Sequence, residues 1–130
     1  MRPVSLQDLL AHADFISLHV PLAADTRHLI GKRELDSMRP TAYLINTSRG
    51  PIVDEAALVD ALRANRIAGA ALDVYEREPE IHPGLRGLAN VVTLPHVGSA
   101  TLQTRIAMGM ACVENVTGFF EGREPPNRVA

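Results

Sequence analysis

The sequence predicts an α/β fold in which helices flank a parallel sheet. Short, strongly apolar runs alternate along the 130 residues with longer runs of helical periodicity. Such alternation requires crossovers between strands, and crossovers produce a parallel sheet. The strand-like runs are nearly continuously apolar, which predicts helices on both faces of the sheet. Hydrophobic residues make up 46% of the chain and charged residues 22%, a balance that allows a well-filled core.

Local patterns predict eight elements. In chain order these are a helix at 5–13, strands at 15–20 and 42–47 with a short helix at 32–38 between them, a helix at 54–65, strands at 68–74 and 91–94, and a long helix at 101–121. Ser5 and Asp8 match a capping box in its weaker Asp form. Pro21 stops the first strand, FISLHV, and the short helix ends before Pro40.

The second half of the chain carries equally clear signals. Asp54 is the expected N-cap of the helix that follows it, and Leu58 and Leu62 lie on its apolar face. Small residues in the third strand, AGAALDV, predict close packing. Gly122 ends the long last helix, before a tail that contains two consecutive prolines.

Charge and composition exclude several classes of partner. The formal net charge is −2 and the isoelectric point is near 6.2, so no basic excess attracts nucleic acid or an anionic membrane. No run of 18 apolar residues suggests a membrane span, and the start of the sequence lacks the apolar stretch of a signal peptide. Cys112 is the only cysteine, and its apolar surroundings predict a buried thiol. We therefore expect a cytoplasmic protein.

Three ionisable residues follow three predicted strands. Arg49 comes two residues after AYLINT, Glu78 four after AGAALDV and His96 two after VVTL. Ligands of open parallel α/β sheets bind beyond the carboxyl ends of the strands. Each residue alone is weak evidence, since such loops are often only solvated. Because parallel strands end at one edge, we expect the three side chains to converge there.

The three side chains suit one kind of reaction. An arginine binds a carboxylate through two parallel hydrogen bonds and polarises an adjacent carbonyl. A histidine exchanges a proton with an alkoxide or hydroxyl group, and a nearby glutamate orients the ring and favours its charged form. These functions predict a small 2-keto acid or 2-hydroxy acid as substrate. A separate hydride carrier is also required, because no side chain can carry a hydride.

Three stretches of the chain resemble the D-isomer-specific 2-hydroxyacid dehydrogenases. They are DFISLHVPLAADTRHLIG, MRPTAYLINTSRGPIVDEAALVDALRANRIAGAALDVYEREP and NVVTLPHVGSAT, and they cover most of the chain in the order of that family. The resemblance implies part of a Rossmann-type NAD(P)-binding domain. It also implies a reaction between a 2-keto acid and a D-2-hydroxy acid, with glyoxylate/hydroxypyruvate reductase as the preferred subtype.

The resemblance further implies a role for individual residues. Arg49 is similar to the catalytic, substrate-binding arginine, His96 to the acid/base and Glu78 to the glutamate that supports the histidine. Ser99 is expected beside the substrate. The positions expected against NAD or NADP are Val20, Pro21, Thr26, Thr47, Ser48, Arg49, Asp73, His96 and Gly98.

Purely structural interpretations of some of these residues stay open. Asp73 could be a turn former, Val20 and Pro21 a simple strand stop, and Ser99 the N-cap of the last helix. No metal site is expected, because the five histidines show no metal-ligand spacing with carboxylates and Cys112 has no partner. A glutamine partner for the histidine, as in formate dehydrogenase, is absent, since Glu78 occupies that position.

The glycine-rich phosphate-binding loop is missing from the sequence. No G-x-G-x-x-G follows a strand and opens a helix. We therefore expect residues 1–130 to form a single truncated nucleotide-binding domain with the long C-terminal helix and tail of the family, without the glycine-rich first half and the substrate domain. Alone, the chain should bind NAD(P) weakly or not at all and should be inactive. One face of its sheet should also lack covering helices, and we expect the chain to self-associate through FISLHV or to need a separate N-terminal half.

Two other functions remain open at this point. The chain could be a non-enzymatic nucleotide-binding or corepressor-like interaction module. It could also be an inactive truncated product. The joint presence of Arg49, Glu78 and His96 favours the enzyme, because a scaffold does not need these three residues.

Overall fold

The computed structural model describes residues 2–129 and divides the chain into two compact units, Met1–His96 and Val97–Ala130. Each unit is described by itself. The first unit contains the sheet and all three candidate catalytic residues. The second unit contains the long last helix and the tail.

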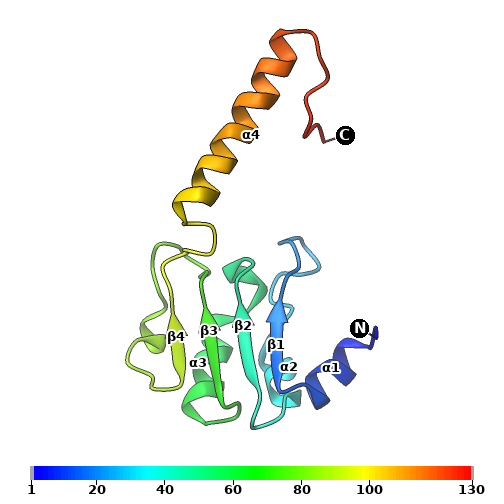
Figure 1. The fold of residues 1–130 in the computed structure, drawn as a ribbon. Coiled ribbons are helices and arrows are strands. Elements are labelled where there is room, and N and C mark those ends of the chain that lie inside the picture. The colour runs from blue at the N-terminus through cyan, green and yellow to red at the C-terminus, as the bar shows by residue number, and fades with distance from the viewer. Residues whose placement is uncertain (1, 130) are drawn as a thin grey trace. The chain divides into compact units, whose positions relative to one another are not determined.

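The first unit is built on a four-stranded parallel sheet. Its strands are β1 (Phe15–Leu18), β2 (Tyr43–Asn46), β3 (Gly69–Leu72) and β4 (Val91–Thr93), in the order β1-β2-β3-β4 (Figure 1). All three neighbouring pairs are parallel. The predicted α/β class and parallel sheet are confirmed. Consequently, the segments after β2, β3 and β4 all leave the sheet at the same edge.

One helix precedes the strands, and two helices and two 3-10 turns connect them. In chain order these elements are α1 (Leu6–His12), α2 (Lys32–Ser37), η1 (Gly50–Ile52), α3 (Glu55–Arg63) and η2 (Pro83–Leu85). Both predicted caps are present. The Ser5 hydroxyl accepts the Asp8 N–H at 3.1 Å, and the Asp54 carboxylate accepts the Ala57 N–H at 3.0 Å. Each cap satisfies an N–H group that has no partner inside its helix.

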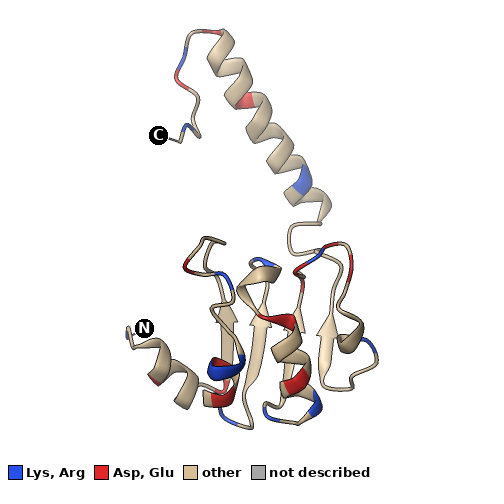
Figure 2. Ribbon diagram, turned by 180° about the vertical axis from the view of Figure 1, so that it is seen from behind, with Lys and Arg blue, Asp and Glu red and all other residues tan. Residues whose placement is uncertain are grey.

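Within the described part of the first unit, helices cover one face of the sheet. Figures 1 and 2, two views from opposite directions, show that α2 and α3 lie on the same face of the sheet. Charged residues occur on these helices, whereas the four strands carry none. Burial therefore alternates along β1 and β2. The uncovered face agrees with the expectation that the truncated domain lacks the covering helices of one sheet face. Apolar side chains lie on the uncovered face as well as on the covered one. Because successive residues of a strand point to opposite faces, the strand sequences are nearly continuously apolar.

The core lies between the sheet and the helices. Its fully buried side chains include Leu44 from β2, Leu58 and Leu62 from α3, and Ile30 and Ile52 from the connecting segments. Burying each such side chain contributes about 1.5–3 kcal/mol. This core holds the strand ends, and so the loops at the carboxyl edge of the sheet, in fixed positions.

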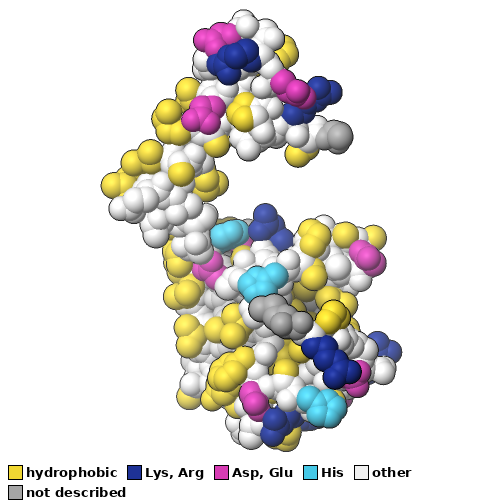
Figure 3. Space-filling view, turned by 45° about the vertical axis from the view of Figure 1, so that its right-hand side comes forward, with side chains coloured by type: hydrophobic (Ala, Val, Ile, Leu, Met, Phe, Trp, Pro, Cys, Tyr) yellow, Lys and Arg dark blue, Asp and Glu magenta, His cyan; other side chains and the backbone are white. Residues whose placement is uncertain are grey.

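The uncovered face of the sheet is apolar. Phe15 and Tyr43 stack with ring centroids 5.6 Å apart, and they are 68% and 44% exposed, while Val92 is 58% exposed. The Tyr43 ring lies over Gly69, where a Cβ atom would come within 3.0 Å of it. Figure 3 shows hydrophobic side chains gathered along this side of the first unit. We call this surface, defined by Phe15, Tyr43 and Val92, the open face.

The second unit is the helix α4 (Leu102–Phe120) with the tail folded back along it. Thr101, and not Ser99, is its N-cap, accepting the Thr104 N–H at 3.2 Å. Asn115 and Asn127 join helix and tail through two hydrogen bonds of 3.0 Å. Cys112 is exposed, so the predicted buried thiol is wrong: apolar neighbours along α4 are themselves exposed within this unit. Among residues 2–129, no helix has the length and hydropathy that a membrane crossing requires.

Candidate active site

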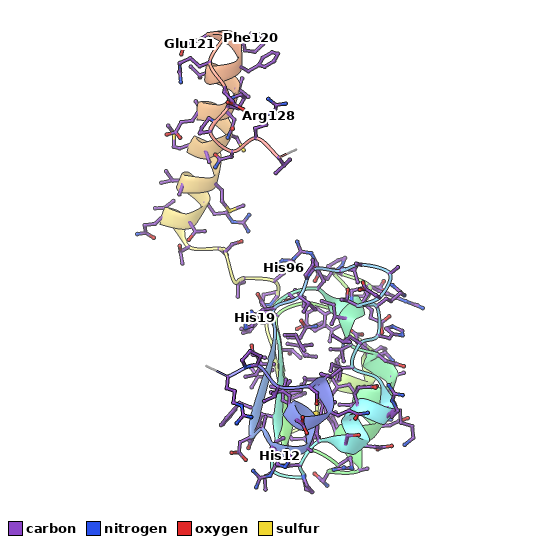
Figure 4. The ribbon with its side chains drawn as sticks, turned by 90° about the vertical axis from the view of Figure 1, so that its right-hand side faces the viewer. His12, His19, His96, Phe120, Glu121 and Arg128 are labelled. Atoms are coloured by element: carbon purple, nitrogen blue, oxygen red, sulfur yellow. The ribbon has the colours of Figure 1, made fainter. Side chains whose placement is uncertain are left out.

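A histidine–glutamate pair lies at the carboxyl edge of the sheet. His96 Nδ1 and Glu78 Oε2 are 2.7 Å apart, and the two side chains are 47% and 36% exposed. Figure 4 shows His96 at the end of the first unit opposite His12, which precedes β1. Glu78 and His96 are 18 positions apart in sequence, and the segment between them includes β4, which returns the chain to this edge. The structure thus brings together two of the three predicted catalytic residues.

The backbone around the pair holds it in place. The Tyr75 N–H donates to Glu78 Oε1 at 3.1 Å, which leaves Oε2 for the histidine. The Tyr75 hydroxyl donates toward the carbonyl oxygens of Leu72 and Leu94, at 3.1 and 2.8 Å, and so connects the ends of β3 and β4. His96 has a φ of 55°, in the left-handed region that residues with a side chain seldom adopt.

The pKa of the Glu78 carboxyl group is lowered from its ordinary value. Partial burial acts in the opposite direction and is the largest single influence. The hydrogen bonds with the His96 ring and the Tyr75 N–H, together with the positive charge of Arg49, outweigh it. Glu78 is therefore ionised at neutral pH, where its carboxylate can serve as a negatively charged partner for His96.

Titration of the Glu78 carboxyl carbon by NMR should give a midpoint below the ordinary value of 4.5. Because the folded pKa lies below the unfolded one, ionised Glu78 adds to stability above pH 4.5, and this contribution is lost as the pH falls through the folded value. His96→Ala should raise the midpoint, because it removes the hydrogen bond and the charge. A midpoint at or above 4.5 in the unsubstituted chain would contradict the pairing.

Arg49 lies on the neighbouring loop, after β2. Its guanidinium is exposed, and Nη1 donates to the Ser48 carbonyl oxygen at 2.7 Å. Buried Asn46 builds this loop: its side chain donates to the Arg49 carbonyl oxygen at 3.0 Å and accepts the Ser48 N–H at 3.1 Å. Because β2, β3 and β4 are parallel, the Arg49 loop leaves the sheet at the same edge as the pair, and the charge of Arg49 helps to lower the pKa of Glu78.

Gly50 joins the arginine loop to the glutamate loop. A Cβ atom at Gly50 would lie 1.8 Å from the carbonyl carbon of Tyr75 and 2.4 Å from the Glu76 nitrogen. No other residue permits this approach, because the obstacle is backbone. The loops that carry Arg49 and Glu78 are therefore packed directly against each other.

The residues expected beside a cofactor occupy several positions. Thr47 is exposed after β2, and the Ser48 hydroxyl donates to the Leu18 carbonyl oxygen at 2.7 Å, which ties the arginine loop to the end of β1. Asp73 is buried at the end of β3, and its N–H donates to the Asn46 carbonyl oxygen at 3.0 Å.

The loop after β1 contains the other expected cofactor contacts of the first unit. The Thr26 hydroxyl donates to the Pro21 carbonyl oxygen at 2.7 Å and accepts the Ala23 N–H at 2.7 Å, so Thr26 also shapes the loop that begins with Val20 and Pro21. His19, beside Val20, is exposed and hydrogen-bonded to Ser17 at 2.8 Å rather than packed within a strand.

Gly98 and Ser99 belong to the second unit, two and three residues after His96 in the chain. Sequence reasoning missed Tyr75, Gly50 and Asn46, which hold the site together. Only Gly50, directly after the singled-out Arg49, carried a signal that could have been noticed.

The carboxyl edge of the sheet presents polar groups that could meet a dinucleotide cofactor, and the start of a helix. Asp73 and Arg49 place polar groups at the sheet edge, where a nicotinamide ring would meet the histidine. Helix α3 also begins at this edge, but carboxylates occupy its start: Asp54 caps it, and Glu76 accepts the Glu55 N–H. A pyrophosphate needs such N–H groups free of negative neighbours. The start of α3 is therefore not free to bind a pyrophosphate.

A hollow of about 480 Å³ lies beside the glutamate loop. Its lining is mixed in charge and includes Glu55, Glu76 and Arg77. Within the described range 2–129, however, no group of three histidine, cysteine, aspartate or glutamate side chains is placed to hold a metal ion.

Comparisons with known proteins agree with the geometry. Residues 1–98 match the family model described as D-isomer specific 2-hydroxyacid dehydrogenase, NAD binding domain. A glyoxylate reductase of Aeropyrum pernix is 54% identical over 127 residues, which cover 96% of this chain and 38% of the relative. A glyoxylate reductase of Thermococcus litoralis is 51% identical over 126 residues, again covering 38% of its length. The chain thus spans about two fifths of these curated relatives.

Solved structures show the same similarity. The TT0316 protein of Thermus thermophilus superposes with a TM-score of 0.93 at 46% identity, covering 98% of this chain and 41% of that one. An NADPH-dependent glyoxylate/hydroxypyruvate reductase of Sinorhizobium meliloti, solved with NADP and malonate, gives 0.92 at 40% identity, covering 97% and 40%.

A parallel sheet with an Arg, Glu and His set at its carboxyl edge defines a Rossmann-type dehydrogenase domain. Within this class of dehydrogenase domains, the match of 98 of the 130 residues to one family model identifies the family. The chain belongs to the D-isomer specific 2-hydroxyacid dehydrogenase family, whose domain of this type binds NAD.

Proposed function

We propose that this chain carries the catalytic edge of an NAD(P)-dependent oxidoreductase that interconverts a small 2-keto acid and a D-2-hydroxy acid. Glyoxylate and hydroxypyruvate are the preferred substrates, because relatives at 54% and 51% identity are glyoxylate reductases and one at 40% identity is a glyoxylate/hydroxypyruvate reductase. The observation that carries the proposal is the 2.7 Å contact between His96 Nδ1 and Glu78.

The proposal gives each side chain a task. Glu78 holds Nδ1, so Nε2 is the ring atom that can give a proton to the substrate carbonyl oxygen. The Arg49 guanidinium can bind the substrate carboxylate in two hydrogen bonds. A bound nicotinamide supplies or accepts the hydride. In the reverse direction, neutral His96 takes the proton of the hydroxyl group.

The proposal is tested with a chimeric enzyme. Residues 1–130 are fused to the N-terminal part of the Aeropyrum pernix glyoxylate reductase, which provides the region that this chain does not match. We expect the chimera to oxidise NADH or NADPH when glyoxylate, hydroxypyruvate or pyruvate is added. The 130-residue chain alone should show no turnover and no micromolar affinity for NADH by calorimetry. A folded chimera without reductase activity on any of the three acids would refute the function.

We also propose that another polypeptide covers β1 and the open face. Among the described residues, β1 pairs with β2 alone, so its outer edge has unpaired N–H and C=O groups. The occupant is a second copy of the chain or a separate N-terminal half. No nucleic acid or membrane partner is proposed. The exposed thiol of Cys112 favours the reducing cytoplasm as the location.

In light scattering, the chain should give the mass of a dimer or larger assembly rather than 14.1 kDa. Phe15→Asp should shift the distribution toward the monomer, because it places a charge on the exposed, stacked ring position of the open face. Val4→Asp, at a residue 57% exposed outside the sheet, is the matched control and should have no effect. A well-behaved monomer would exclude self-association.

A further inference from the structure

Two glutamates connect the start of α3 with the loop that carries Glu78. Glu55 Oε1 accepts the Glu76 N–H at 2.7 Å, and Glu76 Oε1 accepts the Glu55 N–H at 3.0 Å. The second oxygen of Glu76 lies 3.2 Å from His28 Nε2. We call this reciprocal pair of hydrogen bonds between Glu55 and Glu76 the glutamate clasp.

Helix capping alone does not account for the clasp. Asp54 already serves as the N-cap of α3 through the Ala57 N–H. The Glu55 carboxylate does not bond to its own helix but reaches a loop 21 residues away in sequence. Glu55 is only 6% exposed, and burial raises the pKa of its carboxyl group, with a further contribution from the neighbouring Glu76. Placing two carboxylates together is unfavourable unless N–H donors hold them.

The clasp acts on the peptide unit that positions Glu78. The N–H that Glu55 binds belongs to the peptide between Tyr75 and Glu76. Gly50 packs against this same peptide, and the preceding N–H, that of Tyr75, holds Glu78 Oε1. Contacts from the α3 start and from the arginine loop therefore fix the short segment from which Glu78 reaches His96.

We propose that Glu55 and Glu76 are positioning residues for the catalytic pair: their clasp sets the place of the Tyr75–Glu76 peptide and thereby the Glu78–His96 hydrogen bond. The effect on catalysis rests on the proposed function. The effect on the pairing does not, because it can be measured in the chain itself without any substrate.

The test uses ring-nitrogen NMR of His96 in the 130-residue chain at neutral pH, with Glu78→Ala as the reference for an unpaired ring. Glu55→Ala should move the His96 signals most of the way toward this reference. Glu55→Gln should leave them near those of the unsubstituted chain, because the amide oxygen still accepts the Glu76 N–H. Asp54→Ala, which removes only the cap, should lower the unfolding midpoint without moving the His96 signals.

The proposal is overturned if Glu55→Ala lowers stability as Asp54→Ala does while the His96 signals stay unchanged. If Glu55→Ala does not fold, Glu76→Ala is judged by the same criteria, since it removes the other half of the clasp. In the chimeric enzyme, Glu55→Ala should lower kcat at least tenfold and change KM little. An inactive chimera combined with shifted His96 signals would reject the proposed function and leave the clasp established.

Discussion

Replacing His96 with alanine in the chimeric enzyme should lower kcat by about 10² to 10⁴-fold, the range that a positioned general acid contributes. KM should change little, since the ring acts mainly in the transition state. Arg49→Ala should raise KM and lower kcat together, because the guanidinium both binds the carboxylate and polarises the carbonyl group. Arg49→Lys should recover only part of the loss, because an ammonium group lacks the planar pair of donors.

The controls for these substitutions come from the opposite edge of the sheet. His12 ends α1 ahead of β1, and Arg39 precedes β2, where it pairs with Asp14 at 2.8 Å. His12→Ala and Arg39→Ala should leave kcat and KM unchanged. Steady-state kinetics with glyoxylate at several concentrations separates the two constants. If His96→Ala and Arg49→Ala behaved like these controls, the assignment of the acid and the substrate anchor would be wrong.

Replacing Gly50 with alanine should be the most damaging single-methyl change in the first unit. The added Cβ would overlap the Tyr75 carbonyl carbon at 1.8 Å, so a loop or the strand behind it has to move. Overpacking usually costs about 1–3 kcal/mol, and a clash with backbone belongs at the upper end of this range or above. The loss should appear in urea unfolding, and the His96 ring signals should shift because the Glu78 loop is displaced.

Gly31→Ala is the matched control for this substitution. Gly31 precedes α2 in the same unit, and a Cβ atom there would meet Glu34 Oε2 at 3.5 Å, an ordinary contact. We expect a loss of at most about 1 kcal/mol, the usual difference between residues at an N-cap. Equal losses for the two substitutions would show that the close approach at Gly50 does not matter.

The sequence predicted the elements and their order well because their signals are local. Ser5 and Asp54 cap α1 and α3 as expected, since a cap depends on residues three positions apart. The strands end earlier than the apolar runs that predicted them. For example, β1 spans Phe15–Leu18, whereas the predicted strand covered residues 15–20. Strand limits depend on the neighbouring strand, which a local pattern does not contain.

Contacts between distant segments escaped prediction. Cys112 was expected to be buried from its neighbours in sequence, yet burial depends on what packs against α4. The approach of Gly50 to Tyr75 and the pairing of Glu55 with Glu76 join residues more than 20 positions apart. No periodicity or motif indicated these contacts.

The sequence by itself determined the alternation of strands and helices, and with it the common edge on which Arg49, Glu78 and His96 were expected, because parallel strands connected by crossovers end on one side. Only the tertiary structure decided that Nδ1 of His96 meets Glu78 at 2.7 Å and that Gly50 and Glu55 hold the glutamate loop. The physical reason is range: chain direction follows from local propensity, whereas a hydrogen bond of this length depends on the packing of several separate segments.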